Sequence, residues 1–110
     1  MRQSNDPFYV LLRDEHVQEF NRQRQPGTAC DLSALSFRGR DLRGLDARQV
    51  NFQDAYFRDA DLRGIDFREA NLEGASLAHA KVSGCYFPPE LSADELRLSV
   101  EYGTRLRYRR

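Results

Sequence analysis

The sequence predicts an all-β solenoid, a fold in which short extended segments and turns alternate around an apolar interior. The first observation is a period of five: residues 30–89 divide into the twelve blocks CDLSA, LSFRG, RDLRG, LDARQ, VNFQD, AYFRD, ADLRG, IDFRE, ANLEG, ASLAH, AKVSG and CYFPP. The second is that the third residue of every block is apolar, and is Leu or Phe in ten of them. The third is that the first residue is apolar in eleven blocks, with Arg40 as the exception.

A period of five excludes the two common regular elements. On an α-helix a step of five residues advances about 140°, which would scatter the apolar side chains around the whole circumference. On a continuous strand, successive apolar residues would alternate between the two faces because five is odd. The chain must therefore turn once in every block, with the first and third side chains pointing inward and the second and fourth pointing outward. The fifth residue helps to form the corner, where a turn needs positive φ, and glycines fall at five of these places: Gly39, Gly44, Gly64, Gly74 and Gly84.

Two blocks, ADLRG at 60–64 and ANLEG at 70–74, match the motif A(D/N)LXX. On these blocks and on the period, the sequence resembles the pentapeptide-repeat family over 60 of its 110 residues. The resemblance implies a right-handed quadrilateral β-helix in which four blocks make one coil, so the twelve blocks imply about three coils. About three stacked units are the minimum that buries a continuous core. We therefore expect an N-terminal capping segment over 1–29, the pentapeptide-repeat β-helix over 30–89, and a C-terminal capping helix and tail over 90–110.

With four blocks per coil, residues twenty apart stack roughly 4.8 Å from one another. The predicted interior columns are Leu32, Phe52, Leu72; Phe37, Phe57, Leu77; Leu42, Leu62, Val82; and Ala47, Phe67, Phe87. The first coil has two weak points, the small Ala47 at a core position and the cation Arg40 at an inward position. Both are tolerated if this end of the stack is open or covered, and the N-terminal segment is the natural cover.

The N-terminal segment carries helix signals. Asp6 before Pro7 is an N-cap and first-turn signal, and Pro26-Gly27 is a stop. Between these signals charged residues interleave with apolar ones: Phe8, Leu11, Leu12, Val17 and Phe20. A helix fits this pattern. An extended piece over residues 8–12 before a helix starting near Asp14 also fits, because Phe-Tyr-Val-Leu-Leu is strand-like.

The C-terminal segment predicts a helix over 93–102. Ser92-Ala-Asp-Glu95 is a capping box, and Gly103 is placed to end the helix. We prefer the interpretation that this helix covers the last coil, because exposed ends of stacked β structure invite association. It can also pair with a second copy, giving a homodimer in place of a monomer, and the candidate self-association residues are Leu96, Leu98, Val100 and Tyr102. The arginine-rich end, residues 105–110, is expected to be a frayed and solvated terminus.

The charges are balanced, with 17 basic and 17 acidic residues. No field of one sign would attract nucleic acid or a membrane surface, so we expect neither as a direct partner. No apolar run approaches a membrane span and the polar start does not resemble a secretory signal, so we expect a cytoplasmic protein. Cys30 and Cys85 are far apart and have no Cys or His nearby at ligand spacing, so reduced, buried thiols are expected.

We expect no enzymatic activity, no cofactor and no metal. His16 and His79 are the two histidines of the sequence, and neither lies in an HxxxH or HExxH pattern. The sequence contains no nucleophile elbow and no phosphate loop. Aspartates recur at second positions, where the repeat itself explains them, so the pattern does not indicate a catalytic carboxylate pair.

Arginines recur at the fourth position and stack into three columns on the outer surface: Arg38 with Arg58, Arg43 with Arg63, and Arg48 with Arg68. Aspartates at second positions lie beside two of these columns as cross-strand neighbours of opposite sign. One interpretation is a solvated charge lattice that neutralises itself. The other is a patch that docks an anionic partner, strongest beside Arg38 and Arg58, where the second positions are Ser36 and Tyr56.

The sequence therefore favours a protein-interaction module, whose protein partner it does not identify. Some relatives in the resembled family are acidic DNA mimics that bind type II topoisomerases such as gyrase, and this is the alternative function. The present sequence departs from them in having few coils, no net negative charge, and Arg where a phosphate-mimicking face carries Asp or Glu.

Overall fold

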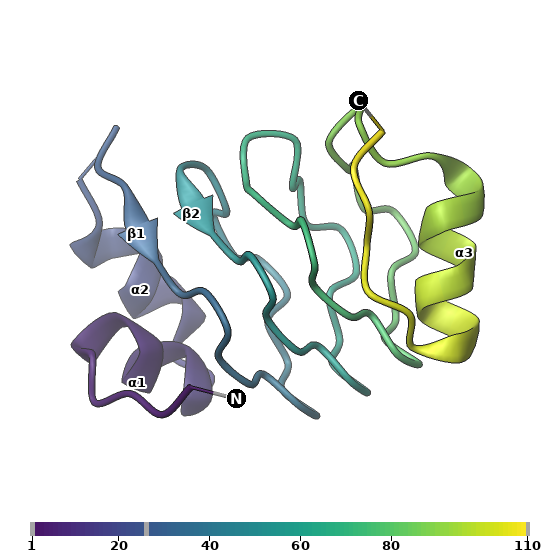
Figure 1. Cartoon of the computed structure of the whole chain (residues 1–110). Helices are drawn as coiled ribbons and strands as arrows, with labels where there is room; N and C mark the ends of the chain where they lie inside the picture. Colours follow the sequence, from purple (N-terminus) through teal and green to yellow (C-terminus); the bar gives the residue numbers. More distant parts are fainter. Residues whose placement is uncertain (1, 26, 110) are drawn as a thin grey trace.

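The computed structural model describes residues 2–25 and 27–109. Along the chain it contains helices α1 (Pro7–Arg13) and α2 (Val17–Gln23), strands β1 (Cys30–Asp31) and β2 (Val50–Asn51), and helix α3 (Ala93–Tyr102). Stacked coils occupy the middle of the molecule, with α1 and α2 at one end of the stack and α3 at the other (Figure 1). Pro26, half of the predicted stop signal, and Arg110 lie outside the described residues.

Residues twenty positions apart pair in parallel, as the predicted columns require. β1 pairs with β2 in the register Cys30 to Val50. Isolated parallel bridges continue the same spacing along the chain: Ser36 with Tyr56, Asp41 with Asp61, Asn51 with Asn71, Tyr56 with Ser76, Asp61 with Lys81, and Asp66 with Tyr86. These pairs link three successive segments of the chain, which we call the first coil (30–49), the second coil (50–69) and the third coil (70–89).

The backbone hydrogen bonds of one block explain why five residues are the repeat. In block 60–64 the N–H of the first residue closes a turn, and the N–H of the second residue bonds to the previous coil. The N–H groups of the third and fifth residues bond to the next coil. The fourth N–H has a side chain as its partner, the aspartate at the second position. The five donor and acceptor pairs are Ala60 N to Phe57 O, Asp61 N to Arg40 O, Leu62 N to Lys81 O, Arg63 N to Asp61 Oδ1, and Gly64 N to Ser83 O. Every donor in the block is satisfied, which a buried backbone demands.

Regular strand structure is short in this arrangement. Each side of a coil offers about three residues before the next corner, and the fourth N–H bonds to a side chain in place of a neighbouring strand. Among the described residues, β1 and β2 are the two elements that reach strand length, and the other sides of the coils pair through single bridges. The all-β expectation is therefore met only in part, because β1 and β2 are two residues long each, whereas helical ends were expected.

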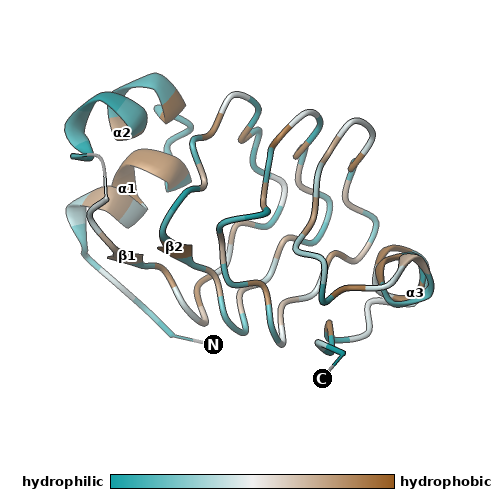
Figure 2. Ribbon diagram, turned by 90° about the horizontal axis from the view of Figure 1, so that it is seen from above, coloured by the Kyte–Doolittle hydropathy of each residue, from teal (hydrophilic) through white to brown (hydrophobic). Residues whose placement is uncertain are grey.

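The predicted columns form the interior, except that Val82 and Phe87 of the third coil are only partly buried and pack against it. All third-position side chains of the first two coils are at most 2% exposed, and so are Leu72 and Leu77 of the third coil. Phe37 and Phe57 stack with ring centroids 5.3 Å apart, and Phe67 and Phe87 stack at 5.8 Å. Figure 2 shows the coils from above, with hydrophobic and hydrophilic segments alternating along the chain. A continuous apolar interior of this kind is the main source of stability.

The corners have the backbone conformation that the glycines predicted. All five corner glycines have positive φ, between 71° and 86°. Five residues with side chains adopt the same conformation at the same block position: Ala34, Gln49, Asp54, Asp59 and His79. A left-handed backbone is unfavourable for residues with a Cβ, so the hydrogen-bonded coil imposes the geometry even where the sequence lacks glycine.

The N-terminal segment is helical, so the extended alternative over residues 8–12 is wrong. Asp6 accepts the N–H of Phe8 and caps α1, as predicted. The helix is broken at Glu15, whose φ of 63° ends α1, and α2 begins at Val17. Leu12, Val17 and Phe20 are buried and belong to the same apolar cluster as the coils.

Polar groups of the same segment bond to the outer edge of the first coil. This edge has no preceding coil to supply partners, so side chains take their place. The bonds are Tyr9 Oη to Ser36 O at 2.8 Å, Asp41 N to the Glu15 carboxylate, Asn21 Nδ2 to Gly44 O at 2.9 Å, and Asp46 N to Asn21 Oδ1 at 2.9 Å. The N-terminal helices are thus joined to the coil by directed bonds as well as by apolar packing.

The predicted helix over 93–102 is confirmed as α3. Ser92 accepts the N–H of Glu95, and Gly103 ends the helix with a φ of 75°. The capping box is half formed, because the Glu95 carboxylate bonds to Arg107 and not to the N–H of Ser92. Leu96 and Val100 pack against the core.

The prediction of a frayed terminus is wrong for the described part of the tail. Arg105 pairs antiparallel with Ser76 on the outer edge of the third coil. Leu106 is 1% exposed, accepts the N–H of Gly74 at 2.7 Å and donates to Ala75 O at 2.8 Å. The tail supplies the backbone partners that a following coil would have supplied.

Candidate functional site: an arginine face

Aspartates at the second position bind the arginine two residues later in the same block. The side chain of Asp61 accepts three N–H groups of Arg63: the backbone N–H at 3.3 Å, Nε at 2.9 Å and Nη2 at 2.7 Å. The same fork forms in the other three blocks that have this sequence, and the pairs are Asp41 with Arg43, Asp46 with Arg48, and Asp66 with Arg68. A carboxylate and a guanidinium match in this two-bond geometry, which is the strong form of the interaction.

The sequence suggested cross-strand contacts between these charges, and the structure places most of them within one block. One contact does cross between coils, from Arg43 Nε to the Asp61 carboxylate at 3.4 Å. Asp61 therefore faces two guanidinium groups, and Arg43 faces two carboxylates.

These contacts keep the carboxylates ionised. The hydrogen bonds from Arg63 lower the pKa of Asp61 to about 2, and those from Arg68 lower the pKa of Asp66 to about 2. The pKa values of Asp41 and Asp46 are lowered by the same kind of bond from Arg43 and Arg48. Since a lowered pKa means that the ionised form is favoured in the fold, the pairs persist at every pH above the ordinary carboxylate range.

Four of the six column arginines are thus bonded to the aspartate at the second position of their block, and Arg38 and Arg58 have no aspartate there. Arg38 follows Ser36, whose hydroxyl accepts its backbone N–H at 3.4 Å but offers no charge. Arg58 follows Tyr56, and its nearest carboxylate is that of Asp59 at 3.9 Å. Among the described residues Arg38 has no carboxylate within ion-pair distance.

Tyr56 lies on the same face but is engaged by the C-terminal tail. Arg105 donates from Nη2 to the Tyr56 hydroxyl at 2.8 Å, and its guanidinium carbon lies 5.6 Å from the ring centroid. Arg105 also approaches Asp54 at 3.5 Å. The tail therefore brings a further arginine to the face on which Arg58 lies.

A hollow of about 490 Å³ opens beside Arg38, where α1 meets the first coil. We call it the arginine hollow, and its lining residues are Tyr9, Arg13, Ser36, Arg38, Gly39, Arg40 and Asp59. The repeat pattern alone did not predict a site role for Tyr9, Arg13 or Arg40. The signal for Arg40 was present, since it is the one charged residue at a first position, and the structure exposes its side chain instead of burying it.

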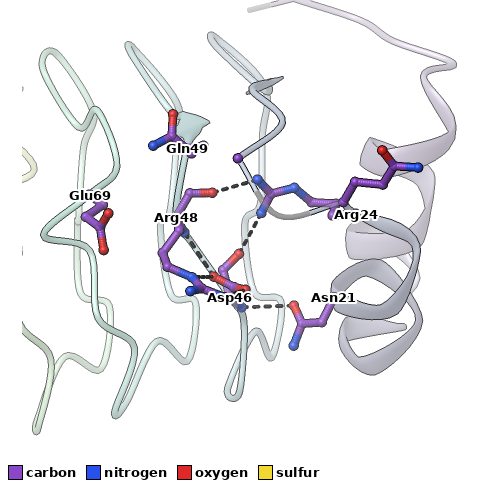
Figure 3. A pocket seen from close by; sticks show the side chains of 8 residues that line it. Asn21, Arg24, Asp46, Arg48, Gln49 and Glu69 are labelled. Carbon is purple, nitrogen blue, oxygen red and sulfur yellow. Dashed lines mark hydrogen bonds and ion pairs between the residues drawn. The ribbon is translucent and has the colours of Figure 1, made fainter.

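A second hollow, of about 320 Å³, lies between α2 and the coils and is neutral. Figure 3 shows Arg24 reaching from the end of α2 to the backbone of the first coil. Its guanidinium donates to Asp46 O at 3.0 Å, Thr28 O at 3.0 Å and Arg48 O at 2.6 Å. Arg48 beside it is paired with Asp46. These bonds fasten the helix to the coil and leave no free cation in the region that Figure 3 draws.

The candidate self-association residues divide between two sides of α3. Leu96 and Val100 pack inward against the core. Leu98 is half-buried, and Tyr102 is 72% exposed. Tyr102 is the residue of this group that is most accessible to a second copy.

Other functional groups of the described residues are few. Cys30 and Cys85 are free, and burial raises the pKa of both thiols, so neither is activated as a thiolate. Within residues 2–25 and 27–109 no three His, Cys, Asp or Glu side chains gather as a metal site. None of the helices in that part of the chain is long and apolar enough to span a membrane.

Comparison with known families supports the repeat. A family model described as pentapeptide repeats matches residues 30–68 and 51–87, with eight copies of the repeat. Together these matches cover more than half of the chain. Neither the curated proteins nor the solved structures gave a match. The period of five, the coil spacing of twenty and this match agree, and the chain belongs to the pentapeptide-repeat family.

Proposed function

We propose that this protein is a non-enzymatic interaction module that docks an acidic protein partner on the face carrying Arg38 and Arg58. The observation that carries the proposal is the difference in commitment among the column arginines. Arg43, Arg48, Arg63 and Arg68 each bond to their own aspartate. Arg38 has no carboxylate within ion-pair distance among the described residues, and Arg58 has the 3.9 Å contact to Asp59 in place of a two-bond fork, so both guanidinium groups can receive a carboxylate from outside.

We further propose that the coils form a right-handed quadrilateral β-helix of about three turns, which presents this face on a rigid frame. Support comes from the parallel pairing at a spacing of twenty and from the positive φ values at the corners. A rigid frame lowers the conformational cost of binding, because the docking side chains are carried by an ordered backbone. We place the protein in the cytoplasm, where free thiols such as Cys30 and Cys85 stay reduced.

DNA mimicry, the alternative function, gains no support from the surface charges. A mimic of the DNA backbone needs unpaired carboxylates in a row, and the stacked Asp41 and Asp61 are neutralised by Arg43 and Arg63. We therefore base the test on a protein partner.

The test is a quantitative pull-down followed by measurement with the purified partner. Wild-type protein is compared with the double variant Arg38→Ala/Arg58→Ala and with the matched control Arg43→Ala/Arg63→Ala, which removes the same charge from the paired columns. We expect a partner that binds the wild type and the control but not the double variant. Equal binding to all three proteins would contradict the proposed face.

A further inference from the structure

The arginine hollow has an excess of positive charge that three other hollows on the surface lack. Three arginines line it, Arg13, Arg38 and Arg40, against one carboxylate, Asp59. The hollow of Figure 3 has two arginines against Asp46 and Glu69. Two further hollows each have more carboxylates than arginines in their lining.

Two of the three arginines in the hollow are uncommitted. Arg38 and Arg40 are exposed and have no carboxylate within 4.0 Å among the described residues. Arg13 is held by Asp14 at 3.3 Å. Two free guanidinium groups at one hollow can each receive a carboxylate in the two-bond geometry that the paired columns already use internally.

The wall of the hollow is fixed by Tyr9. Its hydroxyl donates to Ser36 O at 2.8 Å, and its ring contacts Phe37 edge-on, with centroids 5.5 Å apart. Tyr9 thus takes the place of a donor from a preceding coil. The hollow is therefore bounded by an ordered aromatic side chain, while the guanidinium groups of Arg38 and Arg40 have no carboxylate partner.

The backbone of Arg38 adds an acceptor. In the second coil the corresponding carbonyl, that of Arg58, accepts the N–H of Gly39 at 2.8 Å. No described residue donates to the carbonyl of Arg38, because no coil precedes the first and Tyr9 takes the neighbouring carbonyl of Ser36. An open carbonyl beside a free guanidinium matches a peptide, which brings both N–H donors and carboxylate side chains.

We propose that the arginine hollow is the binding site for an acidic peptide segment of the partner, with carboxylates on Arg38 and Arg40 and a backbone N–H on the Arg38 carbonyl. The site rests on the proposed function and makes it specific. An ionised phosphate provides no N–H donor for the open carbonyl. The observations therefore favour a carboxylate-bearing peptide.

The experiment measures fluorescence anisotropy of a labelled hexaglutamate peptide with the full-length protein at low ionic strength, where exposed charges act most strongly. Hexaglutamine is the uncharged control peptide. We expect Arg38→Ala/Arg40→Ala to weaken hexaglutamate binding roughly tenfold, and Asp59→Asn to strengthen it about twofold. Arg63→Ala/Arg68→Ala, which removes the same charge from paired positions, is expected to change binding less than about twofold. Circular dichroism of each variant checks that the fold is kept.

Three results would overturn the site. The first is equal binding of hexaglutamate and hexaglutamine, and the second is equal weakening by the Arg38/Arg40 and Arg63/Arg68 variants, which would show a diffuse charge effect. The third is a stronger response to inorganic phosphate than to hexaglutamate, which would assign the hollow to a phosphate group. Failure of the site is distinguishable from failure of the function: a partner lost with Arg58→Ala but kept with Arg40→Ala leaves the module standing and removes the hollow.

Discussion

Two adjacent faces of the coil stack carry arginines at the same block position, but the arginines of the two faces have different bonding partners. On one face Arg43 and Arg63 follow aspartates and are bound by them. On the other face Arg38 and Arg58 follow Ser36 and Tyr56 and have no such partner. The coils pair in the same register on both faces, since Ser36 bridges to Tyr56 and Asp41 to Asp61 at a spacing of twenty.

The difference teaches that the second position of a block has two roles. Its side chain satisfies the N–H of the fourth residue, and Asp61 and Ser36 both do this, at 3.3 Å and 3.4 Å. An aspartate also holds the arginine side chain in a two-bond ion pair, which a serine, with one neutral oxygen, cannot form. Replacing Asp by Ser at this position therefore keeps the turn and releases the cation.

The first prediction, which has the largest expected effect, tests whether the interior is closely packed behind both faces. Phe57 lies behind the Arg58 face and Leu62 behind the Arg63 face, and both are fully buried. Phe57→Ala is expected to lower the free energy of unfolding by about 3–5 kcal/mol, and Leu62→Ala by about 2–5 kcal/mol, from lost apolar contact and the cavity left behind. Urea denaturation measures both. A loss below about 1 kcal/mol at either position would mean that this side of the interior is not closely packed.

The second prediction concerns the turn bond. Asp61→Ala removes the acceptor for the Arg63 N–H together with both charge contacts, so we expect a loss of about 1 kcal/mol in the free energy of unfolding. Asp61→Asn keeps an acceptor oxygen and should cost less than half as much. On the other face Ser36→Ala should stay within about 0.5 kcal/mol, because the hydroxyl bond is long and exposed. An equal loss for Asp61→Ala and Ser36→Ala would remove the distinction between the faces.

The third prediction concerns the corner glycines, whose backbone conformation is similar next to both faces. Gly39 and Gly64 have φ values of 71° and 79°, and a Cβ added at either would meet no heavy atom within 4 Å. Gly39→Ala and Gly64→Ala should therefore each cost about 1 kcal/mol of the free energy of unfolding, from backbone strain alone. Thermal denaturation of the two variants side by side measures this. A difference above about 0.5 kcal/mol between them would indicate that the two faces differ in backbone as well as in side chains.

The fourth prediction, which has the smallest expected effect on stability, concerns a substitution that gives the Arg38 face the second-position aspartate of the paired face. Ser36→Asp places a carboxylate two residues before Arg38, as in the paired blocks, so we expect the free energy of unfolding to change by less than about 0.5 kcal/mol. Hexaglutamate binding should fall about fivefold, because Arg38 is then neutralised from within. Retention of full binding by Ser36→Asp would contradict the role of the second position.

The period of five was sufficient to predict which side chains point inward and where the corners fall, because each follows from the position of a residue within its block. The spacing of twenty and the stacking of the columns depended on the four blocks per coil that the family resemblance implies. Helix α3 was predictable from Ser92 and Gly103, which are local signals. The break between α1 and α2 was not, since Glu15 adopts a positive φ without being glycine and is bonded to the distant Asp41.

The arginine hollow could not be predicted from the repeat. It depends on where Tyr9 and Arg13 of α1 meet the first coil, which is a long-range contact with no sequence period. The bond between Arg105 and Tyr56 is of the same kind, because it joins positions 49 residues apart. The one feature of the sequence that could have indicated the hollow is Arg40, a cation in a series of otherwise apolar first positions.

The most direct test of the account is the exchange of the arginine Nε–H protons with water, measured by NMR near pH 6. The account predicts that Arg63, whose Nε donates to Asp61 at 2.9 Å, exchanges more slowly than Arg38, whose Nε has no described acceptor. In Asp61→Ala the exchange of Arg63 should rise to that of Arg38. Equal exchange of Arg63 and Arg38 in the wild-type protein would show that the two faces hold their arginines alike, and would contradict the account.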